Sequence, residues 1–307
     1  MNVRLTPRLA LLLTLAPLMW AGNAVVGRLM VGRVPPLLLN SLRWSIATLI
    51  LLPLAWRVVR DLRAIRGAWT YLLILGTLSV GAFNSLQYLA LETSTPLNVT
   101  LINASMPVGM LIVGALFYRV RPTLAQFAGA LLSLAGVAMV VSRGRWSALA
   151  QLHFVPGDGY MLIAVMGWAV YSWLLVRPPP SMRAPQRPDW DWAAFLFVQM
   201  MFGLITSSAA ALTEAAVGRH APVDWGNGWI WAALAFVAVG PSVIAYRAWG
   251  LGVARAGPTL AAFFVNLSPL FTALLSAWLL SEWPQPYHAL AFVLIVAGIV
   301  VSARRSA

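Results

Sequence analysis

The chain contains no cysteine and no lysine, and it has only eight acidic residues and three histidines among its 307 residues. The missing cysteines exclude disulfides, thiolate metal sites and cysteine nucleophiles. Charged residues make up 9% of the chain and hydrophobic residues 61%, with a mean hydropathy of +0.81. Soluble domains average roughly 25% charged and 45–50% apolar residues. A lipid bilayer, and not water, is therefore the main solvent of this chain.

The apolar residues gather into segments of about 20 residues, the length that crosses the hydrocarbon core of a bilayer. Such segments are expected at residues 9–29, 37–56, 68–90, 97–118, 123–142, 158–176, 192–214, 229–249, 259–280 and 287–303. The sequence therefore predicts an all-α polytopic membrane protein with ten transmembrane helices.

The second half of the chain repeats the first. At a spacing of 162 residues, matching positions are Pro96 and Pro258, Pro107 and Pro269, Pro122 and Pro284, Ala135 and Ala297, and Gly136 and Gly298. At a spacing of 148, they are Ala16 and Ala164, Trp20 and Trp168, and Ala21 and Ala169. We expect one five-helix repeat in residues 1–145 and another in residues 146–307. Because five is odd, the second copy enters the bilayer inverted, an arrangement that many secondary transporters use.

The net charge of +13 is spread over loops, without the patch or stripe that binds nucleic acid. Loops on the side of the N-terminus carry 14 of the 21 arginines, and loops on the other side carry five. This bias predicts that both termini are cytoplasmic, with the chain in the cell inner membrane. A cleaved leader is not favoured, because the first apolar run continues to Val26 and has a counterpart around Trp168.

The segment 177–191 between the sixth and seventh helices is rich in proline and arginine. We interpret it as a solvated cytoplasmic linker with polyproline character. A docking site for a proline-motif partner is the less favoured alternative.

Polar and aromatic residues share one face in helices 1, 3, 4, 6, 8 and 9 when spaced as in an α-helix. The candidate substrate-binding residues on these faces are Trp20, Asn23, Asn84, Tyr88, Asn103, Trp168, Tyr171, Tyr246 and Asn266. Trp20 and Trp168 occupy matching repeat positions near mid-span, where two indoles suit an amphipathic ligand. The alternative is structural, since asparagine often forms hydrogen bonds between membrane helices and small residues allow close packing.

Pro107 and Pro269 lie at the midpoints of helices 4 and 9, where proline removes a backbone hydrogen bond and kinks the helix. Asn103 and Asn266 are placed to satisfy the freed carbonyls. Matching kinks are candidates for gating, and a fixed bend without motion is the equal alternative.

Every acidic residue and histidine is expected near a helix end or in a loop. Proton-coupled carriers usually need such a group within the membrane. The sequence therefore favours facilitated transport down a gradient, with no cofactor and no metal site. Arg43 is a candidate partner for a substrate carboxylate, while Arg247 lies close enough to the cytoplasmic face to extend toward water.

An enzyme would need histidine, serine, carboxylate or metal-ligand groups that converge at one depth, and the scattered histidines and peripheral acids argue against one. A channel or a structural assembly protein is the other alternative. It is less favoured because kinks at mid-membrane in both copies suit alternating access. The expected partners are lipid and a small molecule, and a monomer is compatible with the sequence.

The Trp20-Ala21-Gly22-Asn23 segment, the Arg43-Trp44 pair and the proline-bounded helix 96–107 with its copy at 258–269 resemble the EamA family of the drug/metabolite transporter superfamily. The resemblance covers about residues 9–302. Within that family the chain is most similar to YddG-type exporters of aromatic and other neutral amino acids.

This resemblance implies a central cavity formed by helices 1, 3, 4, 6, 8 and 9, and export from the cell by alternating access. Another small metabolite or drug, such as a nucleoside or an organic cation, is the alternative substrate class. The chain departs from exact duplication in one place, because Gln199 and no arginine stands in the helix that corresponds to that of Arg43.

Overall fold

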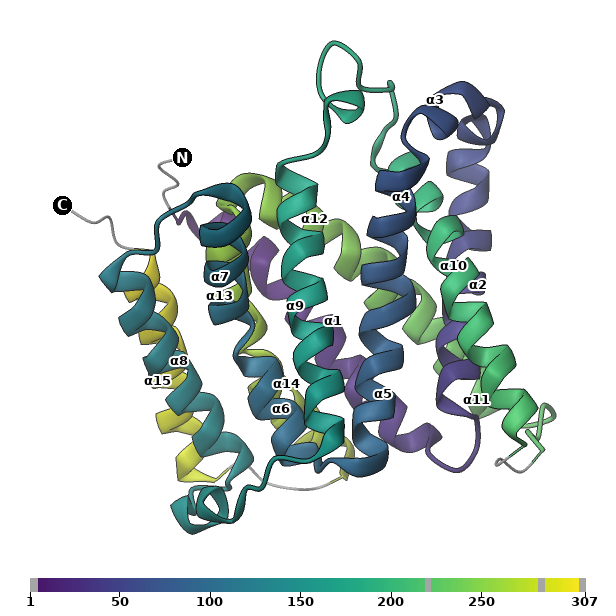
Figure 1. Ribbon diagram of the computed structural model, residues 1–307. Helices are drawn as coiled ribbons and strands as arrows, with labels where there is room; N and C mark the ends of the chain where they lie inside the picture. The colour runs from purple at the N-terminus through teal and green to yellow at the C-terminus, as the bar shows by residue number, and fades with distance from the viewer. Residues whose placement is uncertain (1–4, 219–221, 281–284, 304–307) are drawn as a thin grey trace.

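The computed structural model describes residues 5–218, 222–280 and 285–303, and these residues form helices and connecting loops without any strand (Figure 1). The first copy of the repeat contains α1 (Pro7–Met30), α2 (Pro36–Ala55), η1 (Trp56–Arg60), α3 (Leu62–Gly67), α4 (Trp69–Gly76), η2 (Thr77–Ala82), α5 (Phe83–Thr93), α6 (Pro96–Ala104), α7 (Met106–Tyr118) and α8 (Leu124–Val141). This confirms the all-α membrane class.

The second copy follows the short helix η3 (Trp146–Gln151). It contains α9 (Pro156–Val176), η4 (Pro180–Met182), α10 (Trp192–Val217), α11 (Gly228–Val237), η5 (Ala238–Ile244), α12 (Ala245–Ala256), α13 (Pro258–Val265), α14 (Ser268–Leu280) and α15 (Pro286–Ser302). Several of these helices begin at a proline, which lacks the N–H that the first helical turn leaves unbonded.

Eight helical spans in the described part of the chain are long and apolar enough to cross a membrane. The pair α6 and α7, bent by 44° at Ser105, makes a ninth. A tenth span requires α15, whose 17 residues cover about 25 Å at 1.5 Å per residue. That is somewhat less than the ~30 Å hydrocarbon core, so the number ten stays a prediction.

The two copies run in opposite directions through the protein. In Figure 1, the start of α1, the end of α15, helix α3 and the loop between α9 and α10 lie at one end, and the link from α8 to α9 lies at the other. A hydrogen bond from Trp190 Nε1 to Asp61 Oδ2, at 3.0 Å, joins the α9–α10 loop to the start of α3. Helix α9 is therefore antiparallel to α1, as an inverted repeat requires.

The backbone irregularities also recur at the repeat spacing. The π-helical turns η2 and η5 occupy corresponding places in the third and eighth spans. The break between α6 and α7 lies at Ser105, and the break between α13 and α14 lies 162 residues later, at Leu267. The boundaries 1–145 and 146–307 and the linker interpretation of 177–191 remain predictions.

Helix α9 packs against spans from both copies, among them α5, α7 and α12. Helices α8 and α15 instead form a close pair at one edge (Figure 1). Their approach depends on glycine: a Cβ atom added to Gly298 would lie 2.6 Å from the Gly129 carbonyl oxygen, and the reverse distance is also 2.6 Å. The centre of the protein is thus built around α9, which carries Trp168.

Candidate functional site

Six aromatic side chains form one cluster, in which five rings surround Trp168. We call them the central aromatic cluster, and they are Trp20 of α1, Phe83 of α5, Trp168 and Tyr171 of α9, and Tyr246 and Trp249 of α12. The ring centroids of Trp20 and Trp168 are 5.4 Å apart, with the planes nearly perpendicular. Trp168 lies 5.1 Å from Phe83, 4.9 Å from Tyr171 and 5.6 Å from Tyr246. The two tryptophans at matching repeat positions are therefore direct neighbours.

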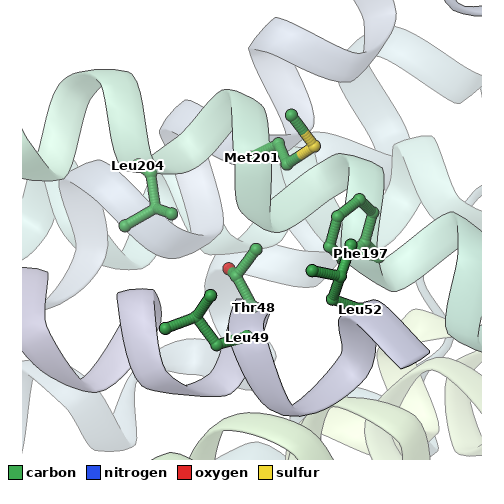
Figure 2. Close-up of a pocket in the computed structure, with 6 residues that line it drawn as sticks. All are labelled: Thr48, Leu49, Leu52, Phe197, Met201 and Leu204. Carbon is green, nitrogen blue, oxygen red and sulfur yellow. The ribbon is translucent and has the colours of Figure 1, made fainter. Parts of the chain in front are cut away.

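The rings of the cluster fill the space between their helices. Trp168 is 3% exposed and Trp249 1%, while Trp20 is half-buried. The rings therefore pack closely against one another at the place where the resemblance implied a cavity. A groove lined by Thr48, Leu49, Leu52, Phe197, Met201 and Leu204 lies elsewhere, between α2 and α10, and shares no residue with the cluster (Figure 2).

Most polar atoms of the cluster have partners. Trp20 Nε1 donates to the Pro241 carbonyl oxygen at 3.3 Å, and Trp249 Nε1 donates to Ser172 Oγ at 3.2 Å. The Tyr246 hydroxyl donates to the Ser79 carbonyl oxygen at 2.6 Å. Trp168 Nε1 is the exception, since it is buried without a hydrogen-bond partner in the described structure. An unpartnered buried donor costs about 1–3 kcal/mol.

Arg43 of α2 is 2% exposed, and the ring of Trp44 lies between it and the cluster. Its Nε donates to Ser242 Oγ at 3.0 Å, and its NH1 donates to Asn23 Oδ1 at 3.0 Å. Its guanidinium carbon lies 4.9 Å from the ring centroid of Trp44, and that ring lies 4.8 Å from the ring of Tyr246. The guanidinium of Arg43 is therefore buried within one ring of the cluster.

Gln199 makes the corresponding contacts in the second copy. Its Nε2 donates to Ser79 Oγ at 2.8 Å and to the Tyr171 hydroxyl at 3.2 Å. Ser79 belongs to η2, as Ser242 belongs to η5. Each copy therefore uses a long polar side chain from its second span to hold the π-helical turn of the other copy. Arg43 and Gln199 differ in charge, but each bonds to a serine of the other copy's π-helical turn.

The four asparagines predicted to bind substrate differ in their hydrogen-bond partners. Asn23 binds Arg43, and Asn84 Nδ2 donates to Asn40 Oδ1 at 3.4 Å. Asn266 Nδ2 donates to the Ala104 carbonyl oxygen at 3.2 Å and to Ser133 Oγ of α8 at 2.8 Å. Asn103 Oδ1 is buried without a partner in the described structure.

Asn266 thus binds the Ala104 carbonyl at the α6–α7 break of the other copy, while its role toward carbonyls freed by proline stays a prediction. Pro107 and Pro269 each stand at the second position of a new helix, α7 and α14, where the missing N–H is tolerated. Their role in gating stays a prediction. The side chain of Tyr88 lies outside the described residues.

Sequence reasoning did not select Phe83, Trp44 or Trp249 as binding residues. For Phe83, which directly follows η2, the π-helical turn is part of the reason, because it adds to the residues per turn and shifts the register that regular spacing assumes. Helices 4 and 9 were expected to line the cavity, yet the rings of the cluster come from α1, α5, α9 and α12.

The described acidic side chains are used at helix ends. Asp158, at the start of α9, accepts from Asn98 Nδ2 at 2.9 Å, from Val155 N at 3.0 Å and from Ser94 Oγ. Glu214 accepts from Leu37 N at 3.1 Å and Leu38 N at 2.9 Å at the start of α2, where a negative charge is favoured. Within the described residues, no three acidic or histidine side chains gather as metal ligands would.

The sequence profile of the EamA-like transporter family matches this chain twice, over residues 8–142 and 155–304. The chain belongs to this family. The two matches fall one on each copy of the repeat, which confirms the resemblance drawn from the motifs.

This EamA-like transporter is 27% identical over 294 residues to an uncharacterized transporter of Archaeoglobus fulgidus, covering 95% of this chain and 96% of the relative. It is 25% identical over 273 residues to the aromatic amino acid exporter YddG of Ancylobacter novellus, covering 88% of each chain. A solved crystal structure with 24% identity superposes with a TM-score of 0.74 and covers 96% of both chains.

Proposed function

We propose that this EamA-like transporter exports aromatic and other neutral amino acids across the cell inner membrane by alternating access, without ion coupling. The observation that carries the proposal is the buried, unpartnered Trp168 Nε1 at the centre of six rings contributed by both copies. The 25% identity to an aromatic amino acid exporter supports the same substrate class. The arginine bias supports a cytoplasmic position for both termini.

The cluster offers what an aromatic amino acid needs. Indole and phenol rings pack edge-to-face or offset against another ring, and such pairs are worth about 0.5–1.5 kcal/mol beyond the buried area. Trp168 Nε1 supplies a hydrogen-bond donor for a carboxylate oxygen. Arg43, one ring away, supplies the positive charge that a carboxylate favours. A substrate that enters must part rings that now pack together, which couples binding to movement of α1, α9 and α12.

Arg43 also weighs against an organic cation. An aromatic cage alone would suit a cation. Four rings of tryptophan or tyrosine contact Trp168 in this cluster. However, a buried guanidinium close to the same rings repels a cation in a medium of low dielectric constant. The charge therefore favours substrates that carry a carboxylate over cations and over nucleosides.

The absence of ion coupling is supported by where the acidic groups lie. Asp158 and Glu214, the acids bonded within the described helices, cap helix ends. Sodium coordination by backbone carbonyls at the helix breaks is the alternative route. At the α6–α7 break, the Ala104 carbonyl oxygen already accepts from Asn266.

Purified protein in liposomes tests the substrate class. Uptake of labelled tryptophan should saturate with concentration. Unlabelled phenylalanine and indole-3-propionate, which keep the carboxylate, should compete, and tryptamine, which lacks it, should compete at least about tenfold less well, the loss of about 1.4 kcal/mol. Equal competition by tryptamine would assign the site to the ring alone and remove the proposed role of Arg43. Saturable uptake of nucleosides with none of tryptophan would overturn the amino acid proposal.

A further inference from the structure

The groove between α2 and α10 is lined by exposed apolar side chains, and on a membrane-spanning protein such a surface is expected to contact lipid. Figure 2 shows three side chains from each helix along it. Its volume is about 270 Å³, and Phe197 to Leu204 extend about 10 Å along α10. Leu49 is 65% exposed and Met201 44%, whereas Phe197 is buried and forms the floor.

The groove is apolar although it contains a threonine. Thr48 Oγ1 donates to the Trp44 carbonyl oxygen at 2.8 Å, so its hydroxyl is already satisfied. The other five lining side chains are leucine, phenylalanine and methionine. Such a surface suits a hydrocarbon chain.

A tryptophan and two arginines follow the groove's α2 wall in the sequence, in η1 on the way to α3. Trp56 follows Leu52 by one turn, at the point where α2 passes into η1. The guanidinium carbons of Arg60 and Arg57 lie 4.6 Å and 5.7 Å from the Trp56 ring centroid. All three side chains are exposed. The nearest acid in sequence, Asp61, accepts from Ala64 N and Trp190 Nε1 instead.

We propose that this surface binds one anionic phospholipid, with an acyl chain in the groove and the phosphate on Arg57 and Arg60. The charge decides the occupant, because two arginines held on an aromatic ring at the predicted cytoplasmic face attract anionic headgroups. Stacking on Trp56 restricts the side chains beforehand, so less conformational entropy is lost when the phosphate binds. A bound lipid would bridge α2 and α10, the helices that carry Arg43 and Gln199.

The test measures lipid binding alone and does not depend on the transported substrate. Full-length protein in a neutral detergent is titrated with dioleoyl phosphatidylglycerol and, separately, dioleoyl phosphatidylcholine, and bound lipid is counted by native mass spectrometry. Wild-type protein should bind one phosphatidylglycerol in preference to phosphatidylcholine. Arg60→Gln should weaken that binding about fivefold, and Arg57→Gln with Arg60→Gln about 25-fold, from the surface electrostatics of each arginine.

Arg247→Gln is the matched control. Arg247 is another exposed arginine, stacked on Trp192 at 3.8 Å, but it belongs to α12 and does not line the groove. It should leave the first phosphatidylglycerol in place. Leu49→Trp, which fills the groove and keeps both arginines, should lower binding of phosphatidylglycerol at unchanged melting temperature.

Three results would overturn the proposal. The first is equal binding of the two lipids by the wild-type protein. The second is an Arg247→Gln loss as large as that of Arg60→Gln, which would indicate a general interfacial effect. The third is a protein dimer that Leu49→Trp abolishes and that lipid does not affect, which would make a second copy the occupant.

Discussion

Replacing Trp168 by phenylalanine separates a binding residue from a packing residue. The change keeps an aromatic ring between Trp20, Phe83 and Tyr246 but removes the Nε1 donor. That donor is buried without a partner in the described structure, so no protein hydrogen bond is lost with it. Trp249→Phe is the control, because it also replaces an indole of the cluster by a smaller ring. Unlike that of Trp168, the Nε1 of Trp249 has a partner, Ser172 Oγ at 3.2 Å.

The two variants share the cost of a smaller ring, so their difference isolates the N–H group. Trp168→Phe recovers the desolvation cost of an unpartnered donor, about 1–3 kcal/mol. Trp249→Phe loses a hydrogen bond between helices, worth about 0.6 kcal/mol on average in membrane proteins. We therefore expect Trp168→Phe to be the more stable variant by about 2–3 kcal/mol. It should nonetheless lower the kcat/KM of tryptophan transport about tenfold, the loss of about 1.4 kcal/mol of binding to the substrate.

The assay pairs melting temperature in detergent with initial transport rates in liposomes. Trp168→Phe should have a higher melting temperature than Trp249→Phe but a lower transport rate. If Trp168→Phe melts lower and transports as well as the wild type, then Trp168 is a packing residue and the substrate binds elsewhere.

Three further predictions follow from the architecture. Gly298→Leu should destabilise the protein by about 3 kcal/mol, because its side chain would collide with the Gly129 backbone, and an unchanged melting temperature would contradict the close packing of α8 and α15. Transport should follow the substrate gradient and ignore imposed pH or sodium gradients at fixed membrane potential, and uphill accumulation driven by either ion would refute this. Reporter fusions after Ala303 and within residues 144–155 should report cytoplasm and exterior respectively, and one location for both would refute the inverted five-plus-five topology.

The membrane class and the family could be predicted from the sequence, because apolar length, arginine bias and repeated prolines are properties of the chain itself. The sequence placed Trp20 and Trp168 at matching positions near mid-span, and the contact between their rings is a finding of the structure. The number of spans was less certain because α15 is short and α6 and α7 are bent.

The details of the site depended on contacts that no local pattern encodes. Arg43 binds Ser242, a residue 199 positions away, and Gln199 binds Ser79, 120 positions away. Both serines lie in π-helical turns, whose sequences differ little from those of ordinary membrane helices. The closure of the centre by ring-on-ring packing is likewise a property of the assembled fold.

Counterflow in liposomes tests the central claim of an aromatic amino acid carrier most directly. Vesicles containing the protein are loaded with unlabelled tryptophan, diluted into a trace of labelled tryptophan, and compared with empty vesicles. A carrier that alternates between two faces should take up label faster, and transiently above equilibrium, when the inside is loaded. The account predicts this acceleration for tryptophan and its loss when tryptamine replaces tryptophan on both sides. Uptake that rises linearly with concentration and is unaffected by the internal load would indicate a channel and contradict it.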